Sequence, residues 1–334
     1  MRPFLPIAVV SLLFLFVACR SDAPLSAHED GYLVGADSAK LFYRVAGTGE
    51  DTLVIVHGGP GAGMNTVFPS IIPLADRYVL IFFDQRGGGR STLPADTSKL
   101  RPEYFVADLD SVRRHFGLDR MNVITHSFGS VLLARYALTH PDRLGRVVLH
   151  GATGPRRAEA GRIIRARAAA APPSPDTTLS NRAAELLRDL LNGTASNAVQ
   201  TCREYEEITR MLAIARGERV THTGSECDAP PDAVAYYYRH TAQLAPKYFG
   251  DWNFTAGLED FTAPLLVVYG EMDSLAISEQ RDWASAVAKG RLLLVPVAGK
   301  PAFSDNPDFV FPAIDTFFRG AWPAAAQKVD GSQP

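Results

Sequence analysis

Residues 122–130 read NVITHSFGS, a short apolar strand that passes through a small polar turn into a helix rich in Ala and Leu. Ser127 lies in that turn. A sharp strand-to-helix turn lifts a serine hydroxyl above the edge of a sheet, and small residues flank it because the backbone is crowded there. Thr125 stands where a glycine is usual. The segment makes Ser127 a candidate nucleophile.

Short apolar runs and helical patterns alternate on both sides of this segment. Such alternation is typical of an α/β protein with a mostly parallel sheet flanked by helices. The predicted strands cover 53–56, 78–83, 122–124, 146–149, 265–269 and 292–295, and the predicted helices include 104–116, 128–140 and 307–318.

Residues 154–257 interrupt the alternation, because they hold helical stretches and breakers but no strand-like run. Ser180 is suited to cap a helix that continues to Leu191 and ends at Asn192-Gly193. Helices inserted between two blocks of one sheet predict a cap that lies over a site at the edge of the sheet.

Two glycine-rich loops follow the first two predicted strands, HGGPG at 57–61 and DQRGGGRS at 84–91. Acyl transfer needs two backbone N–H groups directed at the developing oxyanion, and the loss of one donor typically costs about 2.7–4 kcal/mol. The expected pair is the N–H of Gly59 and that of Phe128, directly after Ser127.

Taken together, these two loops and a serine turn followed by Phe-Gly-Ser resemble the proline-iminopeptidase family of α/β-hydrolases. The resemblance covers about 31–153 and 258–320 and is vaguer between them. It implies a hydrolase with a serine, an acid and a histidine in that order along the chain. Asp273, at the end of the run VVYGEMD at 267–273, stands at the position of the family's acid.

The family's histidine is replaced. It is expected in an Ala-Gly-His segment after the next strand, where this chain has Ala298-Gly299-Lys300. A neutral lysine can act as a base. Lowering the pKa of a lysine from about 10.4 to near 7 requires over 4 kcal/mol, however. Asp273 opposes that change, so an ion pair with Lys300 is expected, and a lysine in such a pair is a poor general base. His150, at the end of a strand, is an alternative base.

The resemblance also implies cap carboxylates that hold the free amino terminus of a peptide. Tyr205-Glu206 is similar to the family's Trp-Glu pair, which makes Glu206 and the neighbouring Glu204 candidate substrate-binding residues. A solvated helix face explains the same acidic residues equally well.

The N-terminal segment has the features of an export signal. Arg2 precedes an apolar run from Phe4 to Ala18, which is short for a membrane-spanning helix. The run ends in Phe16-Val17-Ala18-Cys19, which resembles a bacterial lipobox with Cys19 as the lipidated residue. A plain signal peptide in which Cys19 is incidental is the alternative.

The predicted organisation has six parts in chain order. They are a signal peptide (1–19), a tether (20–30), the first part of the α/β core (31–153), the helical cap (154–257), the second part of the core (258–320) and a disordered tail (321–334).

Export would place Cys202 and Cys227 in an oxidising compartment, where a pair of cysteines can close a disulfide. Such a bond would stabilise the fold by roughly 3 kcal/mol; two free thiols are the alternative. No metal or organic cofactor is implied. The net charge of -2 provides no positive electrostatic field that would attract nucleic acid.

The sequence therefore predicts an exported, membrane-anchored serine hydrolase that acts on peptide N-termini, small amides or esters through an acyl-enzyme on Ser127. Two other classes stay open because the histidine is absent. One is a degenerate hydrolase that serves as a binding or scaffold lipoprotein. The other is a lyase or transferase on the same fold.

Overall fold

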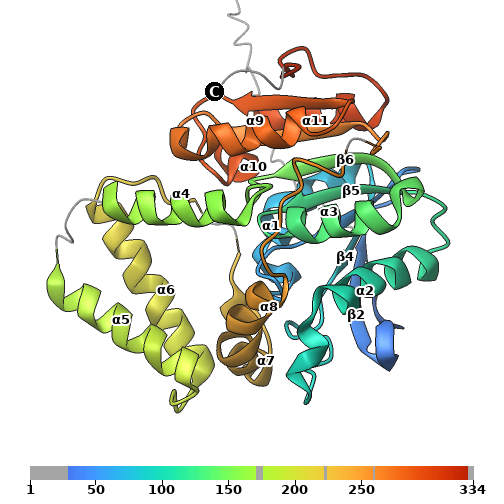
Figure 1. Ribbon diagram of the computed structural model, residues 1–334. Coiled ribbons are helices and arrows are strands. Elements are labelled where there is room, and N and C mark those ends of the chain that lie inside the picture. Colours follow the sequence, from blue (N-terminus) through green and yellow to red (C-terminus); the bar gives the residue numbers. More distant parts are fainter. Residues whose placement is uncertain (1–28, 171–175, 222–223, 259, 330–334) are drawn as a thin grey trace, which may run out of the picture.

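The computed structural model describes residues 29–170, 176–221, 224–258 and 260–329 (Figure 1). The predicted signal peptide, Cys19 and most of the tether lie outside the described residues. Among the residues that are described, no helix is both long and apolar enough to cross a membrane.

An eight-stranded sheet forms the centre of the molecule, in the order β1-β2-β4-β3-β5-β6-β7-β8. β1 and β2 pair antiparallel, and β2 joins β4 antiparallel, whereas the strands from β4 to β8 run parallel. The strands are β1 (Glu29–Val34), β2 (Lys40–Ala46), β3 (Thr52–Val56), β4 (Val79–Phe83), β5 (Met121–His126), β6 (Leu144–His150), β7 (Leu265–Gly270) and β8 (Gly290–Val295).

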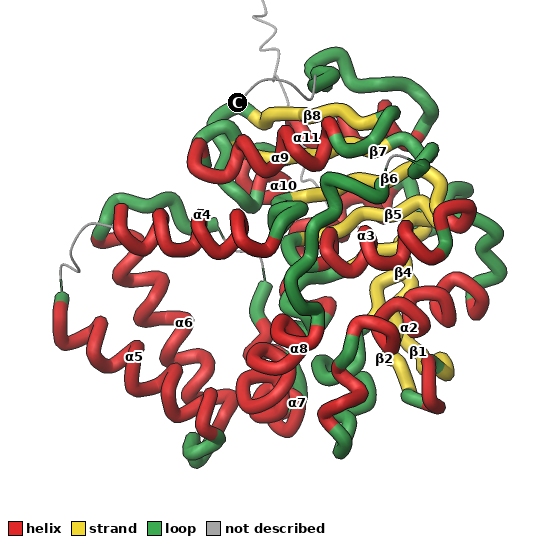
Figure 2. The backbone as a smooth tube through the Cα atoms, in the orientation of Figure 1, coloured by secondary structure: helices red, strands yellow, loops and turns green. Residues whose placement is uncertain are grey.

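Helices cover both faces of this sheet (Figure 2). Alternate residues of β3 face opposite sides, so Val54 and Val56 pack with one layer and Leu53 and Ile55 with the other. The first layer contains α2 (Pro102–His115), α3 (Gly129–Thr139) and α9 (Ile277–Ser285). The second contains α1 (Phe68–Ile71), α10 (Ala302–Asp305) and α11 (Pro307–Phe318). The predicted α/β class is confirmed.

The cap is the helical segment between β6 and β7, and it lies beside the sheet (Figure 1). Two small apolar clusters hold its helices together, one around Cys202 and one around Leu186. An isolated antiparallel β-bridge between Arg156 and Asn253 joins the two ends of the cap. Its elements are α4 (Arg157–Ala170), α5 (Thr177–Asn192), α6 (Ala198–Ala215), α7 (Pro231–Tyr236), the π-helix η7 (Tyr237–Thr241) and α8 (Ala242–Tyr248).

Two ends of the core differ from the prediction. Glu29 and Asp30, assigned to the tether, begin β1, where Asp30 pairs with Arg44 of β2 at 2.6 Å. Residues 321–329 were expected to be disordered, but Ala326 is buried and Gln327 bridges to Leu292 of β8. The physical reason is that an edge strand offers unpaired backbone groups, which a small-residue segment can approach closely.

Candidate active site

Ser127 lies at the turn between β5 and α3 with a φ of 50°, the left-handed region that a serine rarely adopts. Bonds to the next strand hold this conformation. The N–H of Ser127 donates to the His150 carbonyl at 3.1 Å, and its own carbonyl accepts from the Thr153 N–H at 3.1 Å and the Ser130 hydroxyl at 2.8 Å. Strain of this kind persists where the surrounding structure fixes it, and it is typical of functional turns.

Lys300 reaches the serine. Its Nζ lies 3.1 Å from Ser127 Oγ, although 173 positions separate the two residues in sequence. The half-buried Lys300 follows β8, and the preceding Gly299 N–H donates to Asp305 Oδ2 at 2.8 Å. The structure thus places the side chain that replaces the expected histidine within hydrogen-bond distance of the candidate nucleophile.

Asp273 follows β7, the strand next to β8. Its Oδ2 accepts a hydrogen bond from Tyr269 at 2.7 Å. The neighbouring Met272 N–H donates to the Ala298 carbonyl at 2.9 Å, which joins the turn of Asp273 to the segment that carries Lys300. Ser127, Asp273 and Lys300 therefore come from the carboxyl ends of three parallel strands, where sites of this architecture are built.

His150, the alternative base, is engaged on both ring nitrogens. Its Nε2 accepts from the Phe303 N–H at 3.3 Å, so its proton lies on Nδ1 and is donated to His126 Nδ1 at 3.2 Å. The ring also stacks on Phe303 with centroids 3.9 Å apart. Burial lowers the pKa of His150 well below its usual range, and His126 and the Lys300 charge add to the effect. This geometry favours a structural role.

His126 is likewise held neutral. Burial lowers its pKa to about 3, with smaller contributions from the charges of Lys300 and His57. A Cβ placed on Gly151 would lie 3.3 Å from Lys300 Cγ and 3.5 Å from His126 Cε1, so the lysine stem and this ring flank the same glycine. The two histidines form an uncharged layer beside Lys300.

The loop His57–Gly61 lies against the serine turn. A Cβ built on Gly58 would lie 3.0 Å from Ser127 Cβ and 3.5 Å from the Phe128 nitrogen. His57 is fully buried: its Nε2 accepts from the Gln85 N–H at 3.1 Å, so Nδ1 carries the proton and donates to the Gly58 carbonyl at 2.8 Å. Burial lowers the pKa of His57 to about 4.

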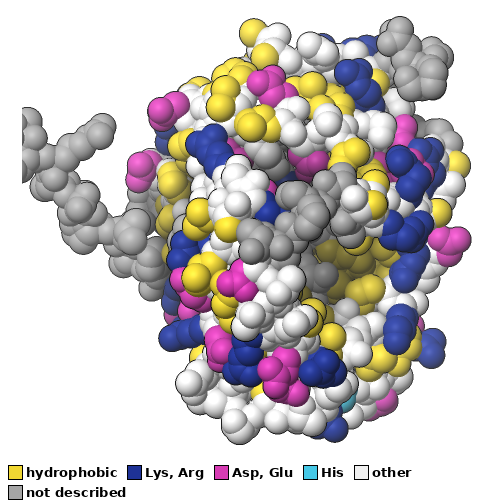
Figure 3. All heavy atoms as spheres, turned by 90° about the vertical axis from the view of Figure 1, so that its left-hand side faces the viewer, with side chains coloured by type: hydrophobic (Ala, Val, Ile, Leu, Met, Phe, Trp, Pro, Cys, Tyr) yellow, Lys and Arg dark blue, Asp and Glu magenta, His cyan; other side chains and the backbone are white. Residues whose placement is uncertain are grey.

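The two candidate cap carboxylates differ in their surroundings. Glu204 pairs with Arg182 of α5 at 2.8 Å, and 41% of its side chain is exposed. Glu206 instead accepts from Ser225 Oγ at 2.7 Å and lines a surface pocket with Ile214 and Val220. The cap face is hollowed, with hydrophobic side chains in the hollow and charges of both signs interspersed around it (Figure 3).

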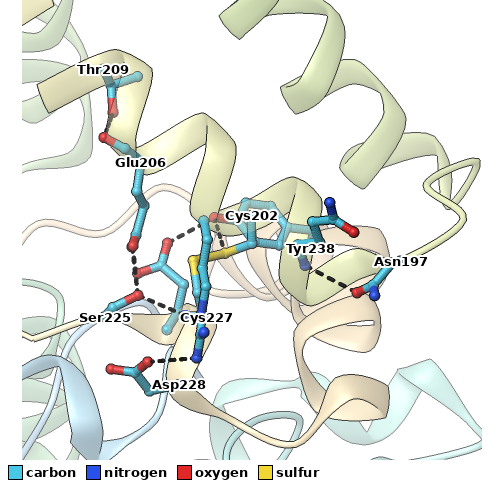
Figure 4. The surroundings of a disulfide bond; sticks show 11 residues. Asn197, Cys202, Glu206, Thr209, Ser225, Cys227, Asp228 and Tyr238 are labelled. Carbon is cyan, nitrogen blue, oxygen red and sulfur yellow. Dashed lines mark hydrogen bonds and ion pairs between the residues drawn. A yellow bond between two sulfur atoms is a disulfide. The ribbon is translucent and has the colours of Figure 1, made fainter. Parts of the chain in front are cut away.

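The structure joins Cys202 of α6 to Cys227 by a disulfide, with the two Cα atoms 5.7 Å apart (Figure 4). Ser225 lies beside it, bonded to Glu206 and to the Cys227 N–H at 2.9 Å. Among the described residues, Cys202, Glu206 and Cys227 bring three potential metal-ligand atoms within 4.8 Å of one another. The disulfide consumes both thiolates that a metal would need.

One segment that links the cap to the Lys300 turn could not be predicted from the sequence. Arg219 donates to the Val297 carbonyl at 2.8 Å, and the Thr221 hydroxyl donates to Asp305. The same Asp305 accepts from the Gly299 N–H. Asp305 thus connects the cap to the residue next to Lys300, a role that depends on contacts between segments over 80 residues apart.

Comparisons with known proteins identify the family. Residues 51–307 match the family model of the alpha/beta hydrolase fold. A proline iminopeptidase of Xylella fastidiosa strain 9a5c is 38% identical over 124 residues, which are 37% of this chain and 39% of that protein. A probable proline iminopeptidase of Streptomyces coelicolor is 31% identical over 69% of this chain and 73% of its own length.

A solved structure extends the likeness of the fold. The proline iminopeptidase of Mycobacterium smegmatis superposes with a TM-score of 0.60 at 21% identity, over 87% of this chain and 98% of its own. The family model covers most of the chain, and the strands that carry Ser127, Asp273 and Lys300 fall within it. The chain therefore belongs to the α/β-hydrolase fold family and, within it, to the hydrolases that resemble proline iminopeptidase.

Proposed function

We propose that the protein is a serine hydrolase that cleaves N-terminal residues of peptides, or small amides and esters, through an acyl-enzyme on Ser127. The observation that carries the proposal is the 3.1 Å contact between Lys300 Nζ and Ser127 Oγ at a turn strained to a φ of 50°. A nucleophile and a base within 2.6–3.2 Å are the usual signature of covalent catalysis.

Lys300 takes the role of the missing histidine in this proposal. In its neutral form the amine accepts the Ser127 proton as Oγ attacks the substrate carbonyl, and the resulting ammonium returns the proton to the leaving amine or alcohol. Water then attacks the acyl-enzyme and gives a proton to Lys300. As the acyl C–O bond breaks and the acid product leaves, the Lys300 ammonium returns that proton to Ser127 Oγ, which restores the serine and the neutral amine. Asp273 positions the turn that faces Lys300, and the Gly59 and Phe128 N–H groups receive the oxyanion.

The surroundings of Lys300 are compatible with a neutral amine. His126 and His150 stay uncharged because burial lowers the pKa of both, so on this side Lys300 faces neutral rings rather than a carboxylate that would stabilise an ammonium group. A carboxylate beside Lys300 would work in the opposite direction, since it favours the charged form of the amine, and Asp273 is the carboxylate that the sequence leads us to expect there. We therefore expect activity to increase with pH beyond the range in which a histidine base is already neutral.

Substrate recognition is assigned to the cap. Glu206 lines a pocket with the apolar Ile214 and Val220 and with Arg210, whose charge is paired with Glu207. The carboxylate and the apolar side chains suit the ammonium group of a peptide N-terminus next to a hydrophobic side chain. Glu204 is less suited to this role because Arg182 already neutralises it. The names of the relatives, proline iminopeptidases, support a substrate with a free N-terminus.

We also propose that the chain is exported and anchored through a lipid on Cys19. The support is the lipobox-like end of the apolar segment, together with a disulfide of the kind that persists in oxidising compartments. Labelling with a fatty-acid analogue in a bacterial host tests this. Incorporation in the wild type and its loss in Cys19→Ser is expected, whereas equal labelling of both would contradict the anchor.

A fluorophosphonate probe tests the enzymatic proposal. We expect covalent labelling of the wild type, no labelling of Ser127→Ala, and faster labelling of Lys300→His because the family's base is restored. An unlabelled wild type together with a labelled Lys300→His would show that the site is intact but inactive, which favours the binding lipoprotein.

A further inference from the structure

One residue of the cap is inserted into the core beside the oxyanion loop. Thr241, at the end of the π-helix η7, is fully buried and its Oγ1 donates to the Gly87 carbonyl at 2.6 Å. π-helical turns inside α-helices are rare and frequently mark functional positions. Gly87 lies in the second glycine-rich loop, 154 positions from Thr241 in sequence.

The methyl group of Thr241 faces the oxyanion loop itself. A Cβ on Gly61 would lie 2.5 Å from Thr241 Cγ2, and a Cβ on Gly87 would lie 2.6 Å from Thr241 Oγ1. Both glycines have positive φ values, 70° and 79°. Thr241 therefore occupies the space that two side chains would otherwise fill, at the point where the two loops meet.

The two loops are coupled to each other as well. The Gly61 N–H donates to Gln85 Oε1 at 3.2 Å, and Gln85 Nε2 donates to the His57 carbonyl at 2.7 Å. The loop from Gly58 to Gly61 has three glycines and one proline, so it has few side-chain atoms with which to fix its own position. Its placement depends on neighbours, and Thr241 is the neighbour that the cap supplies.

We propose that Thr241 is a positioning residue through which the cap holds the oxyanion loop in its catalytic geometry. The inference rests on the proposed function, because it concerns the same Ser127 site. The Thr241 hydroxyl anchors the side chain on Gly87, and the Thr241 methyl limits the movement of Gly61. A displacement of about 1 Å at a catalytic group can cost roughly 100-fold in rate. Through this contact, turnover therefore depends on the position of the cap relative to the core.

The experiment compares Thr241→Ala, Thr241→Ser and Thr241→Val with a matched control, Tyr236→Phe. Tyr236 also connects the cap to the core, since its hydroxyl donates to the Pro94 carbonyl at 2.6 Å. The control therefore removes a cap–core hydrogen bond that does not involve the oxyanion loop. The readouts are kcat and KM for p-nitrophenyl acetate, inhibition by a trifluoromethyl ketone, and hydrogen exchange of a peptide covering 57–63.

We expect Thr241→Ala to lower kcat about tenfold or more with KM changed less than threefold. Thr241→Ser and Thr241→Val should each recover part of kcat, because each keeps one of the two contacts. Inhibition by the ketone should weaken in parallel with kcat/KM, since the adduct has an oxyanion. Exchange in 57–63 should accelerate in Thr241→Ala but not in Tyr236→Phe.

The inference is overturned if Thr241→Ala exchanges like the wild type in 57–63, or if Tyr236→Phe reproduces every effect of Thr241→Ala. The hydrogen-exchange readout does not require turnover. If the wild type fails to react with the fluorophosphonate probe, the proposed function fails, but faster exchange in Thr241→Ala still establishes the contact as the one that holds the loop.

Discussion

The core site and the cap are assembled in different ways. In the core, Ser127, Asp273 and Lys300 follow parallel strands, and backbone bonds from Ser127 to the His150 carbonyl and the Thr153 N–H fix the serine turn. In the cap, side-chain contacts dominate: a disulfide, the Arg182–Glu204 pair and the bond from Ser225 to Glu206. The cap also has two small apolar clusters of its own.

This difference separates two properties of the protein. The backbone of a parallel sheet places the ends of its strands together whatever the side chains are, so residue 300 lies beside Ser127 even where a lysine replaces a histidine. The cap depends on individual side chains, so its substitutions away from the Thr241 contact with the oxyanion loop should change substrate recognition and local stability more than the chemical step. Four predictions test that division, beginning with the core.

Removal of the Lys300 amine should have the largest effect. We expect Lys300→Met to lower kcat by roughly 100- to 10,000-fold, the usual contribution of a general base, with little change in thermal stability. Lys300→His should retain activity and shift the pH–rate profile toward lower pH. Steady-state kinetics between pH 6 and 10 measure both.

Lys289→Met is the matched control for that variant, because Lys289 is exposed on the core away from these turns and its loss should leave kcat unchanged. Normal turnover of Lys300→Met at every pH would remove the lysine from the mechanism.

The buried histidines of the core should make the protein sensitive to acid. Burial lowers the pKa of His57 to about 4 and of His126 to about 3, whereas in the unfolded chain histidine titrates near 6.5. Below that pH the unfolded chain binds protons that the folded protein does not. The free energy of unfolding should fall from about pH 6.5 toward 4, by up to about 1.4 kcal/mol per pH unit for each histidine.

Urea denaturation at pH 7, 6 and 5 measures this slope. His126→Asn should make the slope shallower, because it removes one of the groups that stay neutral. A urea midpoint that does not change between pH 7 and 5 would contradict the assignment of these histidines as buried and uncharged.

Loss of the disulfide should affect the cap more than the core. We expect the double variant Cys202→Ala/Cys227→Ala to lose about 3 kcal/mol of stability, because the bond restricts a loop of 25 residues in the unfolded chain. KM should rise more than kcat falls. Calorimetry and kinetics on the same preparations measure both effects.

Arg182→Ala is the comparison for the disulfide, since it also removes a link between α5 and α6 but at an exposed ion pair. Its cost should stay below about 1 kcal/mol. A double cysteine variant as stable as Arg182→Ala would show that the disulfide is not what holds the cap together.

The smallest effect concerns substrate recognition in the cap. Glu206→Gln should raise KM about tenfold for a substrate with a free amino terminus, because a charge-assisted hydrogen bond contributes about 1.5–3 kcal/mol. An N-acetylated version of the same substrate should show no such change. Glu204→Gln removes a charge that Arg182 already neutralises. It should therefore leave KM within twofold for both the free and the N-acetylated substrate. Equal effects of the two variants would contradict the choice of Glu206.

The sequence by itself determined the local features of this protein. Continuous apolar runs between helical patterns predicted the ends of the inner strands to within two or three residues. A parallel strand that is buried on both faces has such a continuous hydrophobic run. The turn at Ser127 and the lysine at position 300 were likewise evident, since each depends on neighbours in the chain.

Tertiary structure alone decided which distant groups meet. Spacing left open whether Cys202 and Cys227 are bonded, whether His150 is available, and which of Glu204 and Glu206 pairs with Arg182. It also led to the wrong prediction that residues 321–329 are disordered. Each answer depends on packing between segments far apart in sequence, for which local periodicity contains no signal. The contact of Thr241 with Gly61 and Gly87 has the same origin. A glycine-rich loop in the sequence indicates that another group packs closely against the backbone there, but it does not identify the residue.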